Sequence, residues 1–102
     1  MGMSSKSAAF LMESYMAEAA TGDADALYEL GVAYSTGCNG VDVDLVEAHK
    51  WFNLSALNGS LLGQQCRAEI ADEMTAREIA EAQRLARAWL SEHRPHGFRQ
   101  AA

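Results

Sequence analysis

Apolar residues recur at helical spacing in every stretch of this chain that lies between two turn signals. From Ala26 to Tyr34, for example, they follow one side of a helix at intervals of three and four residues. No segment alternates apolar and polar residues at a period of two, and the only proline is Pro95. The sequence therefore predicts an all-α chain of about five helices joined by short loops, and its 102 residues are enough for one domain.

Glycines and capping residues mark where each helix is expected to begin and end. Asp23 is a suitable N-cap, and Asp44 and Thr75 each stand three residues before a glutamate, which is the pattern of a capping box. The first predicted helix covers residues 8–20, and the second begins after Asp23 and ends where the chain turns at Gly37. The third runs from Asp44 to Asn58 and Gly59, the fourth begins at Ser60, and the fifth begins at Thr75.

The same spacing predicts which side of each helix is buried. In the first helix the expected apolar stripe comprises Phe10, Leu11, Tyr15, Ala19 and the methionines between them. In the fourth it comprises Leu61, Leu62, Cys66, Ile70 and Ala71, and in the fifth Ile79, Ala82, Leu85, Ala86, Trp89 and Leu90. Gly31 lies inside a helix, where glycine costs about 1 kcal/mol relative to alanine, so we expect a neighbouring backbone to approach it closely. Arg77 and Glu81 are spaced to interact on the exposed side of the last helix.

The chain also contains an internal repeat. An offset of 37 residues places Gly22 over Gly59 and Ala26 over Gly63, and an offset of 38 places Trp51 over Trp89. Two helices per period, with small residues where helices cross, are typical of a helical solenoid, in which each hairpin buries its apolar face against the next. Trp51 and Trp89 are expected in the core.

One period resembles a known family. The residues that match are Ala26, Leu30, Gly31, Tyr34, Gly37, Gly40, Val41, Asp44, Ala48, Trp51, Ala56 and Gly59. Residues 22–59 are similar to one full Sel-one-like repeat, a subclass of the tetratricopeptide-like repeats. Residues 59–92 look like a degenerate copy, in which Arg67 and Ala71 replace the expected Leu and Tyr. Residues 93–102 have no pattern that could bury a face, so they are predicted to be a tail that is frayed or docked only through Phe98. The resemblance implies a helical domain over residues 1–92. It further implies a right-handed superhelix of antiparallel helix pairs and a role as an adaptor for proteins or peptides.

The loop at residues 35–44, STGCNGVDVD, has the composition of a ligand-binding loop. A calcium loop, however, places its carboxylates before the glycine, and here Gly40 precedes Asp42 and Asp44. A phosphate loop requires a nearby lysine. The pattern favours a structural loop in which Gly37 ends one helix, Val41 covers the core edge and Asp44 caps the next helix.

Charge and hydropathy limit the partners and the compartment. Eight Lys and Arg against fourteen Asp and Glu give a formal net charge of −6, which argues against nucleic acid. The first 22 residues resemble neither a signal peptide nor a membrane span, and the two cysteines have no metal-ligand spacing. We therefore expect a cytoplasmic protein with reduced thiols, in contact with neither a membrane nor nucleic acid. The alternative for Cys38 and Cys66 is a disulfide in an exported protein.

No set of residues suggests catalysis or a cofactor. His49, His93 and His96 share no ligand spacing with the cysteines, and His49 is expected on the exposed side of its helix. Glu69, Asp72 and Glu73 could pair on one helix face for acid–base chemistry, but a second reactive group is missing and a solvated acidic face is favoured. We predict neither an enzyme, nor a metal site, nor a cofactor.

The repeat indicates where a partner would bind. In solenoids of this kind the first helix of each pair lines the concave side. By the alignment, the candidate protein-binding residues are Asp25, Tyr28, Val32, Ser35, Leu62, Gln65, Glu69 and Asp72. They form a mixed, acidic groove with Tyr28 as an aromatic anchor, suited to a basic or apolar peptide. The alternative is a homodimer that covers apolar end faces on the first helix and around Leu85 and Trp89.

Overall fold

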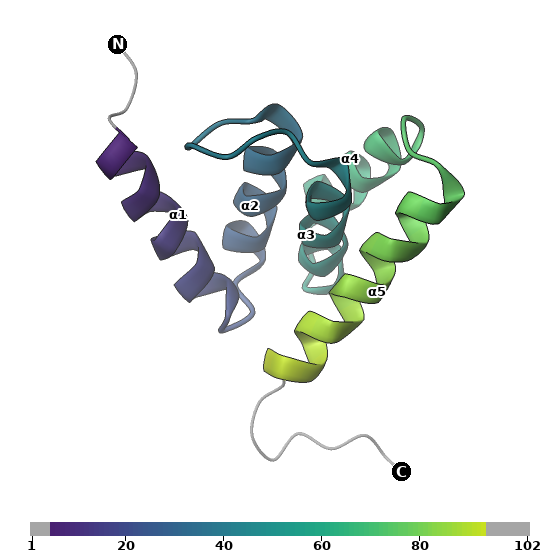
Figure 1. Ribbon diagram of the computed structural model, residues 1–102. Helices are drawn as coiled ribbons and strands as arrows, with labels where there is room; N and C mark the ends of the chain where they lie inside the picture. Colours follow the sequence, from purple (N-terminus) through teal and green to yellow (C-terminus); the bar gives the residue numbers. More distant parts are fainter. Residues whose placement is uncertain (1–4, 94–102) are drawn as a thin grey trace, which may run out of the picture.

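A computed structural model describes residues 5–93, and those residues form five α-helices without a β-strand (Figure 1). The helices are α1 (Ser5–Ala19), α2 (Ala24–Thr36), α3 (Leu45–Leu57), α4 (Leu61–Ala71) and α5 (Ala76–His93). The predicted all-α class and the number of helices are confirmed. His93, the first residue of the predicted tail, is the last residue of α5. The rest of the predicted tail, with the contact expected through Phe98, lies outside the described residues.

Helix α3 lies at the centre of the fold. Consecutive helices alternate in direction, and α3 packs against α2, α4 and α5 (Figure 1). Helix α1 packs on α2, and α2 makes a smaller contact with α4. Within the described part of the chain α4 and α5 have at most marginal contact with each other, although both lie against α3. The last two helices therefore pack mainly against α3.

The core lies mainly between α2, α3 and α5. Its largest fully buried side chains are Trp51, Phe52, Leu27, Leu30 and Leu54. Helix α5 contributes the small residues Ala82 and Ala86, which allow it to approach α3 closely. The buried residues of α2 and α5 follow the predicted faces of these helices.

Gly31 is buried, but its neighbour is a side chain and not the backbone we expected. A Cβ atom added at this position would overlap the aromatic ring of Phe52 on α3. The missing side chain of Gly31 therefore makes room for a large ring in the α2–α3 interface.

Helix α4 is oriented differently from the prediction. Its only residue in the buried class is Gly63, where an added Cβ would overlap the hydroxyl of Ser55 and approach the carbonyl oxygen of Phe52 to 3.1 Å. Leu61 and Leu62, which were expected in the core, are 75% and 58% exposed. Contact with α3 through Gly63 turns these two leucines outward. In α1, Phe10 and Met16 likewise lie outside the buried stripe and are 70% and 40% exposed.

The predicted helix caps form, with one difference. Asp23 accepts a hydrogen bond from the amide of Ala26, and Asp44 accepts one from the amide of Glu47, each at 3.0 Å. Thr75 and Glu78 form both halves of a capping box. At Asp44 the second half is missing, because its amide donates to the carbonyl of Tyr34 at 2.8 Å.

The Glu47 side chain binds Trp51 and Lys50 and does not complete the capping box. Its Oε1 accepts from Trp51 Nε1 at 3.2 Å and forms an ion pair with Lys50 Nζ at 3.3 Å. Lys50 lies over the Trp51 ring at 4.1 Å, and Trp51 meets Trp89 of α5 edge-on with ring centroids 4.8 Å apart. The prediction for Trp51 is confirmed, whereas Trp89 is only half-buried.

The charged pair on α5 also differs from the prediction. Glu81 binds Arg84 through two hydrogen bonds of 2.8 and 2.7 Å and not Arg77. Both partners are exposed, so the pair has little effect on stability. Across the described residues no helix is sufficiently long and apolar to span a membrane.

Candidate protein-binding surface

The predicted binding residues come from two neighbouring helices. Asp25, Tyr28, Val32 and Ser35 lie on α2, and Leu62, Gln65, Glu69 and Asp72 lie on or directly after α4. The α4 group and Asp25 are exposed, whereas the other three α2 residues are half-buried. The surface is therefore formed mainly by α4.

Tyr28 connects the two helices. Its ring packs against Phe52 of α3 with centroids 5.7 Å apart, and its hydroxyl group lies near the thiol of Cys66 on α4. Burial raises the pKa of Tyr28, and the nearby Cys66, Glu29 and Glu69 raise it further. Tyr28, which was expected to anchor a partner, therefore already packs within the fold.

The rest of the α2 side presents few free polar groups. The Ser35 hydroxyl donates to the carbonyl of Val32 at 3.1 Å, within the same helix. Asp25 lies in the first turn of α2, where a carboxylate is stabilised by the positive end of the helix dipole.

The exposed face of α4 includes one residue that the sequence analysis missed. Leu61 is the most exposed large apolar side chain of the described residues, and it adjoins Leu62. Gly63, Arg67 and Ile70 share a helix face at intervals of four and three residues, and this spacing could have identified the inner face of α4.

The charge of the surface is acidic. Glu69 and Asp72 are exposed, and Glu73 follows them. Arg67, the nearest basic residue along α4, donates to Asn53 Oδ1 on α3 at 2.6 Å. Its guanidinium is therefore directed toward α3, away from the exposed carboxylates.

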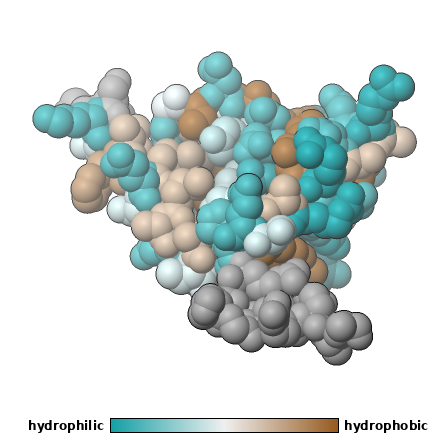
Figure 2. Space-filling view, turned by 60° about the horizontal axis from the view of Figure 1, so that its bottom comes forward, coloured by the Kyte–Doolittle hydropathy of each residue, from teal (hydrophilic) through white to brown (hydrophobic). Residues whose placement is uncertain are grey.

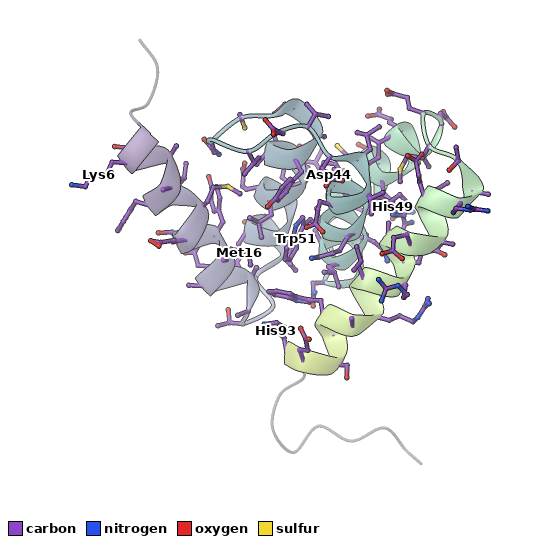
Figure 3. The ribbon with its side chains drawn as sticks, viewed as in Figure 1. Lys6, Met16, Asp44, His49, Trp51 and His93 are labelled. Carbon is purple, nitrogen blue, oxygen red and sulfur yellow. The ribbon has the colours of Figure 1, made fainter. Side chains whose placement is uncertain are left out.

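His49 is buried, contrary to the prediction of an exposed position. It projects from α3 on the side of α4 and α5, with 3% of its surface exposed (Figure 3). Its Nδ1 has no hydrogen-bond partner in the described structure. Burial lowers the pKa of His49, and the positive charge of Arg67 lowers it further. Helical spacing could have indicated this position, because His49 lies four residues after Leu45 and three before Phe52.

The remaining candidate ligands are not assembled into a site. His93 stacks on Trp89 at the end of α5 with ring centroids 3.5 Å apart, and its Nδ1 lies 3.0 Å from the Trp89 carbonyl oxygen. Cys38 and Cys66 are free thiols. Within residues 5–93, no three His, Cys, Asp or Glu side chains are grouped closely enough to hold a metal ion. His96 lies outside the described residues.

The loop after α2 is held by its own chain. Gly37 and Gly40 have φ angles of 74° and 84°, and Asn39 adopts a φ of 59°. The Gly37 amide closes α2 on the carbonyl of Ala33 at 2.8 Å, as expected for a left-handed helix terminus. These contacts agree with a structural loop.

Comparison of the chain with models of known protein families, with curated proteins and with solved structures gives no match.

Proposed function

We propose that this chain is a small, non-catalytic adaptor built from Sel-one-like repeats, which binds a protein or peptide across α2 and α4. The pattern of helix contacts supports stacked hairpins, because α2 touches α4 and α3 packs on α5, as corresponding helices of successive repeats do. On this view the helices follow a right-handed superhelix. Two free thiols favour a reducing compartment and hence the cytoplasm.

The observation that carries the proposal is the exposed apolar face of α4. Leu61 and Leu62 present adjacent apolar side chains to solvent beside Gln65 and Glu69. Exposed apolar residues rimmed by polar ones are typical of protein interaction sites. The acidic rim disfavours nucleic acid and favours a basic or apolar partner.

Affinity capture from a lysate of the source organism tests the proposal. The altered bait should be Leu62→Ser/Gln65→Lys, because both side chains are exposed and their replacement leaves the core intact. Tyr28→Ala is unsuitable, since Tyr28 packs against Phe52. We expect a stoichiometric partner with the unaltered bait and with the control Phe10→Ser, and its loss from the altered bait. Equal recovery by all three would disprove this use of α4.

A homodimer is the second candidate, and the exposure of α1 favours it. Phe10 and Met16 are exposed, and Figure 2 shows moderately hydrophobic residues on the left of the molecule, where α1 lies in Figure 1. At the opposite end Leu85 is half-buried and Trp89 is covered by His93, so that end offers less apolar surface. Only the α1 half of the predicted dimer surface is therefore available.

Sedimentation velocity separates the two candidates. If α1 mediates self-association, the unaltered chain sediments as a dimer and Phe10→Ser as a monomer, whereas Leu62→Ser leaves the dimer unchanged. A monomer at every concentration would eliminate the homodimer.

A further inference from the structure

The outward face of α4 is divided along its length into an apolar and an acidic end. Leu61 and Leu62 lie in the first turn of α4, and both side chains are exposed. Glu69 and Asp72 lie at the other end, and both are exposed. A partner would therefore meet two different environments on one helix.

Helical spacing places these residues on the same side. Leu62, Gln65, Glu69 and Asp72 follow one another at intervals of three and four, which keeps them on one face. At a rise of about 1.5 Å per residue, Leu62 and Asp72 are separated by roughly 15 Å along the axis. Gly63 lies against α3 on the opposite side.

The acidic end lacks basic partners of its own. The ion pairs within residues 5–93 are Lys50 with Glu47 and Arg84 with Glu81, so neither Glu69 nor Asp72 takes part in one. Basic groups on a partner would complement these carboxylates.

We propose, relying on the binding role of α4 given above, that this face recognises an extended peptide with apolar residues at one end and basic residues at the other. An extended chain advances about 3.3 Å per residue, so the two groups should be about five residues apart. The apolar side chains pack on Leu61 and Leu62, and the basic side chains reach Glu69 and Asp72.

Fluorescence anisotropy with labelled synthetic peptides tests this arrangement on the full chain. The matching probe is Leu-Leu-Gly-Ser-Gly-Lys-Lys. The controls are Leu-Leu-Gly-Ser-Gly-Glu-Glu, which reverses the charge, and Leu-Lys-Gly-Ser-Gly-Leu-Lys, which keeps the composition but mixes the two ends. We expect both controls to bind at least about fivefold more weakly, since each loses one or two favourable contacts.

Variants of the protein test which residues of α4 bind the basic end of the peptide and which bind its apolar end. Glu69→Gln/Asp72→Asn should weaken the matching peptide about fivefold and reduce its salt dependence, because two surface charge pairs are lost. Leu61→Ser/Leu62→Ser should weaken it about tenfold through lost apolar burial and leave the salt dependence unchanged. The controls Glu13→Gln/Glu92→Gln and Phe10→Ser change exposed residues elsewhere and should bind normally.

Three results would overturn the proposal: equal binding of the mixed peptide, equal binding by the Glu69→Gln/Asp72→Asn variant, or no binding of the matching peptide. Each leaves the adaptor function open if the cellular partner is still lost from Leu62→Ser/Gln65→Lys. A dimer that Leu61→Ser/Leu62→Ser converts to a monomer would also overturn it, because a second copy would then occupy the face.

Discussion

Gly31 on α2 and Gly63 on α4 allow these two helices to approach α3 closely. Neither has a positive φ, so each is required for space and not for backbone conformation. Gly31 accommodates the Phe52 ring, and Gly63 accommodates Ser55, whose hydroxyl donates to the Phe52 carbonyl at 2.8 Å. The sequence indicated a close approach at Gly31 but could not identify the neighbour, because this depends on how α2 and α3 are rotated.

Gly31→Ala should lower the free energy of unfolding by about 1–3 kcal/mol, because overpacking at Phe52 outweighs the better helix propensity of alanine. Urea denaturation measures the change. In Gly31→Ala/Phe52→Leu the smaller side chain leaves room for the new methyl group, so the loss should be less than the sum of the single losses. Additive losses would contradict direct contact between the two residues.

His49 should make the stability of the fold depend on pH. Since burial lowers the pKa of His49 in the folded chain, the unfolded chain takes up this proton more readily below its ordinary value of 6.5. The free energy of unfolding should therefore fall from about pH 7 to about pH 5, and the contribution of His49 should be constant above neutrality.

Urea denaturation across this pH range measures the effect, with His49→Phe as the test and His93→Gln as the control. His49→Phe should reduce the decline, whereas His93→Gln should retain it. An unchanged decline in His49→Phe would show that another group is responsible.

At the scale of single helices, local sequence predicted most of the structure. The caps at Asp23, Asp44 and Thr75 depend on residues three positions apart, so their pattern is visible in the chain. The orientation of α4 was not predicted, since Leu61 and Leu62 alone resemble the start of a buried face. In the structure Gly63 packs against α3, and the two leucines are therefore exposed.

Asp44→Ala should cost about 1 kcal/mol of unfolding free energy, because the first turn of α3 loses its cap. Asp44→Asn should retain most of the stability, since its side-chain oxygen can still accept from Glu47. Asp42→Ala, a neighbouring exposed change, should cost less than about 0.5 kcal/mol. Thermal or urea denaturation distinguishes these values, and equal losses for Asp42→Ala and Asp44→Ala would argue against the cap.

At the scale of the whole molecule, residues that the predicted repeat aligns do not all have equivalent surroundings. Its alignment places Gly31 over Ala68, yet Gly31 is buried and Ala68 is exposed. The reason is that α2 packs on α3, whereas the corresponding α4 has at most marginal contact with α5. The five helices are confirmed, the limits of the repeats at 22–59 and 59–92 remain predictions, and the binding residues remain untested.

Hydrogen exchange should follow the unequal packing of the helices. Amides of α3 should exchange most slowly, because α3 packs against α2, α4 and α5, whereas those of α1, which packs on α2, should exchange faster. Exchange read by mass spectrometry under native conditions provides the test. Equal protection of α1 and α3 would indicate that the chain opens as a single unit or that another molecule covers α1.

The two tryptophans give the protein an intrinsic optical reporter. Their indole rings, 4.8 Å apart and inclined by 76°, are close enough for their electronic transitions to couple. The coupled pair should produce a paired positive and negative band in the circular dichroism spectrum, superimposed on the helical signal. Trp51 belongs to α3 and Trp89 to α5, so the band measures the attachment of the last helix to the central one without any label.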